Sequence, residues 1–235
     1  MPEGPTDLMA LAMRVWVTRT EPGASRLGMR LVDAGFDAWV RPVIDIEPTA
    51  APQPAGQFAL TIFLSGHAVE FAVNNGWVST PALAIGKSTR RTLARHGIDA
   101  RAPDSASSEG VTAALASDPP QSVMIAAGEG GREVLERWLA ERGIPAVKWC
   151  LYRRVAVSGS LDPAEVIDAI VASSAAALRV VANMWFSSSR SANVATLVPS
   201  ERVAESARAL GFARVFVTEG AGDEAVVAAL GRIAR

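Results

Sequence analysis

Short apolar runs alternate with segments of helical period along most of the chain. The run from Arg14 to Arg19 predicts a strand, and the segment that begins at Glu21-Pro22 and ends near Gly35 predicts a helix. Proline suits the first turn of a helix, and glycine is favoured just after the last. Repeated alternation of strand and helix is typical of α/β proteins with parallel sheets.

The same pattern predicts most of the remaining elements. Further strands are expected over Ala38 to Ile46, Ala59 to Leu64, Ala82 to Ile85, Ser122 to Ala127, Val147 to Val157, Val180 to Ser187 and Arg214 to Thr218. Further helices are expected over Gly66 to Asn74, Ser88 to His96, Ser105 to Ala116, Gly131 to Arg142, Asp162 to Ala175, Ser189 to Ala195, Glu201 to Leu210 and Asp223 to Ile233. The proline-rich stretch Pro48 to Gly56 predicts an irregular connector.

Similar motifs occur in the two halves of the chain. A leucine four residues before glycine occurs at Leu31 and again at Leu139, and Phe63-Leu64-Ser65 is similar to Phe186-Ser187-Ser188. Together these echoes predict two similar α/β domains of about 110 residues each.

Composition excludes several classes of function. The formal charge of −1 on 235 residues argues against a nucleic-acid partner, which usually needs a basic face. No apolar run approaches the roughly 20 residues that span a bilayer, and the start of the chain does not resemble a signal peptide, so a cytoplasmic protein is expected. One cysteine, Cys150, and two distant histidines make a disulfide or a metal site unexpected.

Positive charge is almost entirely arginine, because Lys87 and Lys148 are the only lysines. This bias is explained either by genomic base composition or by arginines that bind carboxylates through paired hydrogen bonds. Composition does not choose between the two.

Glycine and serine turns join several predicted strands to the helices that follow. They are Ser65-Gly66-His67, Gly86-Lys87-Ser88-Thr89, Gly128 to Arg132 and Ser187-Ser188-Ser189-Arg190. Free amides at a helix amino end bind carboxylates as readily as phosphates, although ordinary capping explains the same residues. The turns suggest a ligand with several acidic groups.

Tyr152 is the only tyrosine and lies in Leu151-Tyr152-Arg153-Arg154. A lone tyrosine is commonly a half-buried packing residue whose hydroxyl finds a partner. It could also donate a proton to a leaving hydroxyl, with the neighbouring arginines biasing the phenol.

The order of motifs resembles that of the uroporphyrinogen-III synthase family from Val15 onward. The segments that carry the resemblance are Val17 to Pro22, Pro42 to Pro48, Phe63 to Glu70, Ala84 to Thr89, Gly128 to Glu133, Leu151 to Arg154 and Phe186 to Ser189. The chain departs from the family pattern where Gly66 and Ser189 replace a proline, and where Pro199-Ser200-Glu201 replaces a Gly-Pro-Thr type turn.

The resemblance implies two flavodoxin-like parallel-sheet domains joined by a two-stranded linker. One domain would be discontinuous, over 1–41 and 156–235, and the other would be inserted over 42–155. It also implies a monomeric hydro-lyase of tetrapyrrole and haem biosynthesis. The enzyme would cyclise hydroxymethylbilane, a linear tetrapyrrole, with inversion of the last pyrrole ring and loss of water, using no cofactor or metal.

The resemblance also implies roles for particular residues. Tyr152 would assist departure of the hydroxyl, and the other site residues would line a cleft between the domains and bind substrate. These are Arg19, Ser65, Gly86, Lys87, Ser88, Thr89, Arg132, Ser187, Ser188 and Ser189. Two alternatives stay open: a non-catalytic divergent relative, and a two-lobed module that binds polyanions.

Overall fold

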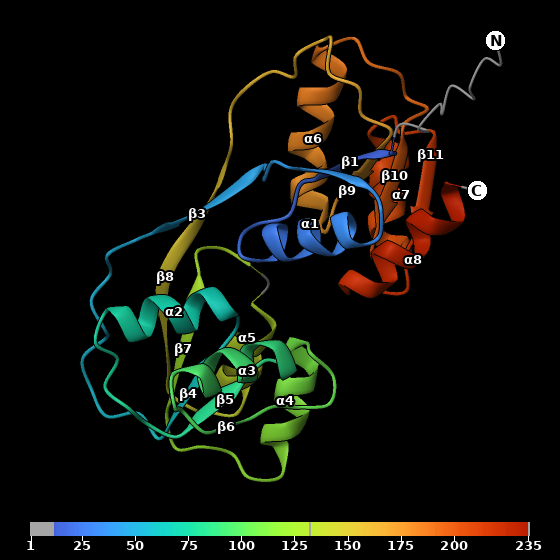
Figure 1. Ribbon diagram of the computed structural model, residues 1–235. Helices are drawn as coiled ribbons and strands as arrows, with labels where there is room; N and C mark the ends of the chain where they lie inside the picture. The colour runs from blue at the N-terminus through green and yellow to red at the C-terminus, as the bar shows by residue number, and fades with distance from the viewer. Residues whose placement is uncertain (1–11, 132, 235) are drawn as a thin grey trace, which may run out of the picture. The chain divides into compact units, whose positions relative to one another are not determined.

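The computed structural model describes residues 12–131 and 133–234. It divides into two compact α/β units, each built on its own sheet (Figure 1). Unit 1 contains the described chain through Asp45 and from Ala156 onward, and unit 2 is Ile46–Val155. The chain passes from one unit to the other within two strands, β3 (Ile44–Pro48) and β8 (Ala146–Ala156).

Unit 1 has a five-stranded parallel sheet of the order β2-β1-β9-β10-β11. Its strands are β1 (Arg14–Val17), β2 (Asp37–Val40), β9 (Ala169–Val171), β10 (Ala195–Val198) and β11 (Arg214–Val217). Numbered along the chain within the unit, this order is 2-1-3-4-5, that of flavodoxin.

Helices cover both faces of the unit 1 sheet. They are α1 (Gly23–Asp33), α6 (Ala175–Ser187), α7 (Glu201–Ala209) and α8 (Asp223–Ile233). Val15 and Val17 pack with α1 and α8, whereas Trp16 packs on the opposite face with α6 and α7. This follows from the alternation of side chains along a strand.

Unit 2 has a six-stranded sheet of the order β6-β5-β4-β7-β8-β3. Its other strands are β4 (Leu60–Phe63), β5 (Ala82–Ala84), β6 (Ala100–Arg101) and β7 (Val123–Gly128). The five strands from β6 to β8 are parallel. Numbered along the chain, they lie in the order 3-2-1-4-5, which is the other common order of doubly wound sheets. The order reverses between β4 and β7.

The helices of unit 2 also form two layers. They are α2 (Gly66–Asn74), α3 (Lys87–Arg95), α4 (Ser108–Ala116) and α5 (Val134–Glu141). Helices α2 and α3 pack together over a core that includes Phe63, Trp149 and Tyr152. Helices α4 and α5 pack together over the core of the opposite face, which includes Ile62 and Ile125.

Three predicted elements between residues 162 and 195 are wrong. The segment from Asp162 to Ala175, predicted to be a helix, instead contains strand β9. The segment from Val180 to Ser187, predicted to be a strand, is the second half of helix α6. The helix predicted over Ser189 to Ala195 is absent there. Valines and aromatic residues suggest a strand at 180–187, but burial of one helical face against the sheet overrides that propensity.

Two smaller differences concern strands. The strand predicted over Ala38 to Ile46 is two strands, β2 and β3, which belong to different sheets and are separated around Pro42. Strands β6 and β10 are not among the predicted elements. The other predicted elements are confirmed, with small shifts at their ends.

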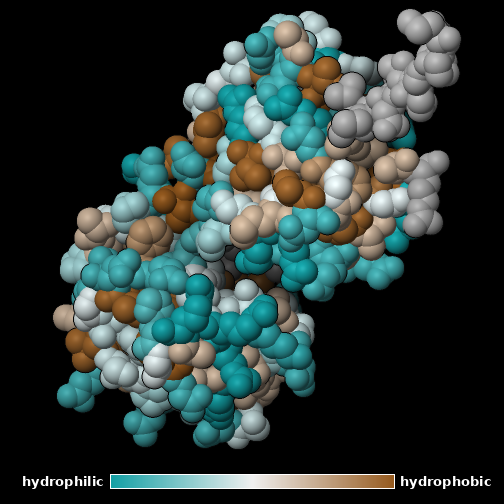
Figure 2. Space-filling view, viewed as in Figure 1, coloured by the Kyte–Doolittle hydropathy of each residue, from teal (hydrophilic) through white to brown (hydrophobic). Residues whose placement is uncertain are grey.

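Hydrophobic residues occur in small groups among hydrophilic ones on the visible face of each unit (Figure 2). Among the described residues, every helix is too short or too polar to cross a bilayer.

Candidate active site

The carboxyl ends of β4 and β7 mark the point where the strand order of unit 2 reverses. The connection after β4 runs through α2 on one face, and the connection after β7 runs through α5 on the other. Doubly wound α/β proteins bind ligands at the carboxyl ends of strands, at such a reversal.

Strand β8 carries an irregularity beside the end of β7. Tyr152, rather than Leu151, lies opposite Gly128, so β8 has an extra residue at this point. In a regular strand, Tyr152 would face away from Trp149 and Leu151, but all three side chains belong to one buried cluster. Bulges of this kind redirect side chains next to functional sites. Here the redirected side chain is the only tyrosine of the chain.

The Tyr152 phenol is held from two sides. Its side chain is buried, and its oxygen lies 2.9 Å from the Ser65 hydroxyl and 3.0 Å from Nη2 of Arg154, which donates to it. The guanidinium carbon of Arg154 also lies 5.2 Å from the centre of the phenol ring. A Cβ at Gly128 would lie 2.5 Å from the ring, so glycine is needed for this packing. The phenol oxygen therefore has a defined position near the carboxyl ends of the strands.

Ser65 links the phenol to the amino end of α2. Its hydroxyl accepts a hydrogen bond from the Ala68 amide at 3.1 Å and caps the helix. The first amides of a helix lack partners within the helix and carry the positive end of its dipole. A carboxylate would therefore be stabilised beside the Tyr152 hydroxyl.

The imidazole ring of His67 packs against the phenol ring of Tyr152. The two rings lie edge-on, with centroids 5.7 Å apart. Burial lowers the pKa of His67, the cation of Arg154 lowers it further, and Glu70 partly opposes the shift. The imidazole is therefore uncharged at neutral pH, which leaves Arg154 as the cation in contact with Tyr152.

The turn after β5 lies near the same strand ends, because β5 is parallel to β4 and next to it. Gly86 caps α3 and has no space for a side chain, since a Cβ there would lie 2.5 Å from Cβ of Ala106. Lys87 and Ser88 are exposed in the first turn of α3, whereas Thr89 is buried. This turn offers a second set of backbone amides at the amino end of a helix.

The loop after β7 contains Gly130 and Gly131, both with positive φ. Such angles favour glycine, so the sequence Gly-Glu-Gly-Gly is explained by the course of the backbone. Arg132, predicted to bind substrate, lies outside the described residues.

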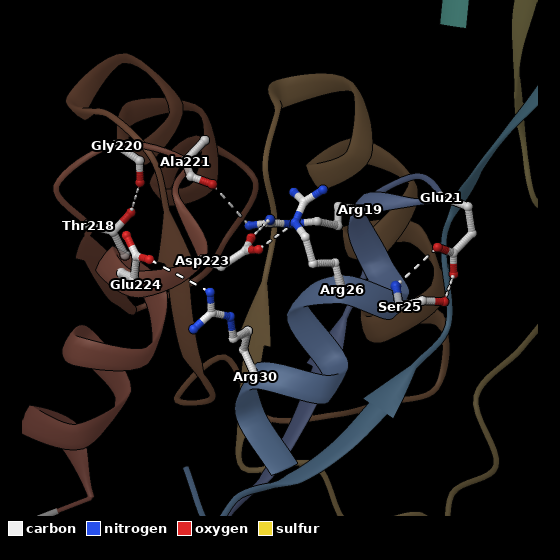
Figure 3. Close-up of polar contacts among 10 residues, drawn as sticks. All are labelled: Arg19, Glu21, Ser25, Arg26, Arg30, Thr218, Gly220, Ala221, Asp223 and Glu224. Atoms are coloured by element: carbon white, nitrogen blue, oxygen red, sulfur yellow. Dashed lines mark hydrogen bonds and ion pairs between the residues drawn. The ribbon is translucent and has the colours of Figure 1, made fainter. Parts of the chain in front are cut away.

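In unit 1, Arg19 follows β1 at the carboxyl edge of that sheet (Figure 3). Its Nη1 lies 2.7 Å from Oδ1 of Asp223, and Nε of Arg26 lies 2.7 Å from Oδ2 of the same carboxylate. The Arg19 side chain is 9% exposed, and burial lowers its pKa, although Asp223 partly opposes this shift. Two arginines share one carboxylate, so this cluster has an excess of positive charge.

A family model described as uroporphyrinogen-III synthase HemD matches residues 25–228. The chain belongs to the uroporphyrinogen-III synthase family. It is 29% identical to the uroporphyrinogen-III synthase of Escherichia coli (strain K12), over 93% of this chain and 100% of that protein. It is 31% identical to that of Salmonella typhimurium (strain LT2), with the same coverage.

A solved structure supports the fold of this family member. The crystal structure of uroporphyrinogen-III synthetase from Helicobacter pylori 26695 matches with a TM-score of 0.66 and 16% identity. The match covers 95% of this chain and 100% of that one. The two-domain α/β fold that the resemblance implied is therefore confirmed.

Ser187, Ser188 and Ser189 do not form the predicted turn between a strand and a helix. They lie at the carboxyl end of α6, where the hydroxyls of Ser187 and Ser188 donate to the Met184 carbonyl. A helix carboxyl end carries partial negative charge and disfavours a carboxylate. We therefore do not retain these serines in the site of this family member.

Ser173 and Ser174 are not among the predicted site residues. They follow β9, and Ser174 caps α6 by accepting from the Ala177 amide at 3.1 Å, as Ser65 does for α2. Ser173 lines a small cavity with Arg19 and Thr218. A pair of serines between an apolar run and an alanine-rich segment was the available signal.

Proposed function

We propose that this protein is a uroporphyrinogen-III synthase, which cyclises hydroxymethylbilane with inversion of the last pyrrole ring. The observation that carries the proposal is the Tyr152 phenol, fixed by Ser65 and Arg154 where the strand order of unit 2 reverses. Family membership supports the same reaction.

In the proposed reaction, the Tyr152 phenol gives its proton to the terminal hydroxyl of the substrate. The carbon–oxygen bond breaks, its electron pair leaves with the oxygen as water, and a delocalised pyrrole cation remains. The substituted carbon of the last ring attacks this cation to form a spiro intermediate, which rearranges and closes the macrocycle. The final ring carbon then loses a proton, which returns to the phenolate. Water is the only other product, so this lyase reaction needs no oxidant or reductant.

Substrate carboxylates are proposed to bind at the amino ends of α2 and α3. Ser65 and the turn from Gly86 to Thr89 provide backbone amides and hydroxyls there. Arg132 stays a candidate on sequence alone. In unit 1, the excess positive charge around Arg19 and the capped amino end at Ser174 suit further carboxylates.

Holding the substrate in one conformation matters as much as proton transfer, because closure without inversion competes with the proposed path. Positioned groups of this kind lower the barrier by fixing the reacting atoms close together. The buried phenol and its two hydrogen bonds supply one fixed point for that geometry. The monomeric state and the cytoplasmic location stay predictions.

The test is to give the purified protein freshly prepared hydroxymethylbilane and to separate the products by chromatography after oxidation. Enrichment of isomer III over a protein-free control is expected. Isomer I alone, with the substrate still bound in an equilibrium assay, would instead identify a non-catalytic polyanion-binding relative.

A further inference from the structure

We propose that Arg154 is a positioning residue for proton transfer by Tyr152, an inference that rests on the proposed function. It fixes which way the phenol proton points and stabilises the phenolate that forms when the proton leaves.

The two adjacent arginines of β8 have different partners. Arg153 reaches Glu47, with its Nε and Nη2 at 3.0 and 2.8 Å from Oε2. Arg154 instead places Nη2 at 3.0 Å from the Tyr152 oxygen and its guanidinium over the ring. Within the described chain, Arg154 is therefore the cation that contacts the phenol.

The direction of the Arg154 hydrogen bond is unambiguous, because a guanidinium donates and does not accept. The Ser65 hydroxyl accepts from the Ala68 amide, and either Ser65 or the phenol can be the donor in the 2.9 Å contact between them. When Arg154 and Ser65 both donate, the two acceptor positions of the phenol oxygen are filled. The phenol proton must then point away from both, toward a bound hydroxyl.

The charge of Arg154 acts at the next stage. When the proton passes to the leaving hydroxyl, negative charge develops on the Tyr152 oxygen, 3.0 Å from the guanidinium nitrogen. A cation already in place stabilises this charge without rearrangement of its surroundings. The guanidinium keeps its own protons throughout, so the phenolate is free to recover a proton when the ring closes.

The kinetic test compares Arg154→Met with Arg154→Lys and with the matched control Arg153→Met. Loss of a hydrogen bond from a charged group should lower kcat on the order of 10- to 100-fold for Arg154→Met, with KM little changed. Arg154→Lys should recover part of the loss, and Arg153→Met should behave as the unmodified protein. Unchanged kcat in Arg154→Met would overturn the inference.

A double-mutant cycle separates positioning from direct binding of substrate. If Arg154 acts through the phenol, Arg154→Met should have little further effect in a Tyr152→Phe background. An equal loss in both backgrounds, or a raised KM with unchanged kcat, would mean that Arg154 binds a substrate carboxylate instead.

A spectroscopic test works without substrate, because Tyr152 is the only tyrosine. The tyrosine Fermi doublet in ultraviolet Raman spectra reports whether the phenol accepts or donates hydrogen bonds. In the unmodified protein, the intensity ratio of the two bands should be that of a phenol that accepts hydrogen bonds. Arg154→Met should change this ratio toward that of a donating phenol, and Arg153→Met should leave it unchanged.

The two kinds of test distinguish the possible failures. A shifted doublet in a protein that forms only isomer I would remove the proposed function and, with it, the catalytic role of Arg154. An active protein whose doublet and kcat do not respond to Arg154→Met would remove this inference alone.

Discussion

The Ser65 hydroxyl lies 2.9 Å from the phenol oxygen of Tyr152, although the two residues are 87 positions apart in the chain. The first residue caps α2 after β4, and the second lies at a bulge in β8. Capping and bulge together connect the amino end of a helix to a potential proton donor.

Replacing Tyr152 with phenylalanine should lower turnover by about 10²- to 10⁴-fold, the usual contribution of a positioned acid. The fold should remain, with a loss of about 1 kcal/mol in the free energy of unfolding from the missing hydrogen bonds. Isomer-resolved kinetics and urea unfolding measure the two effects. Trp149→Phe removes another buried hydrogen bond of β8, to the Ala51 carbonyl, and should keep far more activity. Unaltered turnover in Tyr152→Phe would remove the phenol from the reaction.

Ser65→Ala should reduce both stability and turnover, because one hydroxyl caps α2 and contacts Tyr152. Loss of a cap costs about 1 kcal/mol in the free energy of unfolding. Ser107→Ala is the control, since Ser107 caps α4 by accepting from the Gly110 amide at 3.0 Å. It should cost similar stability but leave turnover intact. Equal effects of both variants on turnover would contradict a specific role for Ser65.

Gly128→Ala should displace the Tyr152 ring, because the added Cβ would lie 2.5 Å from a ring carbon. Overpacking of this kind typically costs about 1–3 kcal/mol, and the phenol would also leave its partners. Turnover and thermal unfolding should therefore both fall. Gly231→Ala, where an added Cβ meets no atom within 4 Å, should leave turnover unchanged. A fully active Gly128→Ala variant would show that the ring position is not critical.

Stability should decline at mildly acidic pH because of His67. Burial and the Arg154 cation lower its pKa, so the unfolded chain, with a value near 6.5, binds the proton before the folded protein does. The free energy of unfolding should therefore fall as the pH decreases below about 6.5, until the folded protein is protonated too. Urea titrations across this range should show that the free energy of unfolding falls less steeply with decreasing pH in His67→Gln than in the unmodified protein. In the control His96→Gln, the part of this fall that is due to His67 should remain. Identical pH dependence of the unmodified protein and His67→Gln would refute this assignment.

Asp223→Asn should destabilise unit 1, because it removes the carboxylate shared by Arg19 and Arg26. A charge buried as deeply as Arg19 and left without its partner costs on the order of 3 kcal/mol. Glu224→Gln is the control: its carboxylate lies 3.9 Å from Arg30, its side chain is 89% exposed, and its loss should change stability by less than about 0.5 kcal/mol. Similar unfolding curves for the two variants would contradict the structural role of Asp223.

Local signals in the sequence were enough to predict several elements. The helix expected over Gly66 to Asn74 has those bounds in the structure, because a Ser65 cap involves atoms only three residues apart. The helix from Asp223 to Ile233 is likewise confirmed. The segment from Ala175 to Ser187 was mispredicted, since its helical state depends on packing Leu178, Val181 and Trp185 against the sheet.

The sequence by itself determined the α/β class and two similar halves, because residue types and short-range spacing carry those signals. Tyr152 as the candidate acid came from the family resemblance, since the residues alone fit a packing role equally well. The sequence did not indicate which arginine reaches the phenol: only the tertiary structure assigns Arg153 to Glu47 and Arg154 to Tyr152. The strand orders, the bulge opposite Gly128 and the position of Ser65 beside Tyr152 also depended on the tertiary structure. Each results from pairing between segments far apart in the chain, where the free energy comes from packing and hydrogen bonds that local residue patterns do not specify.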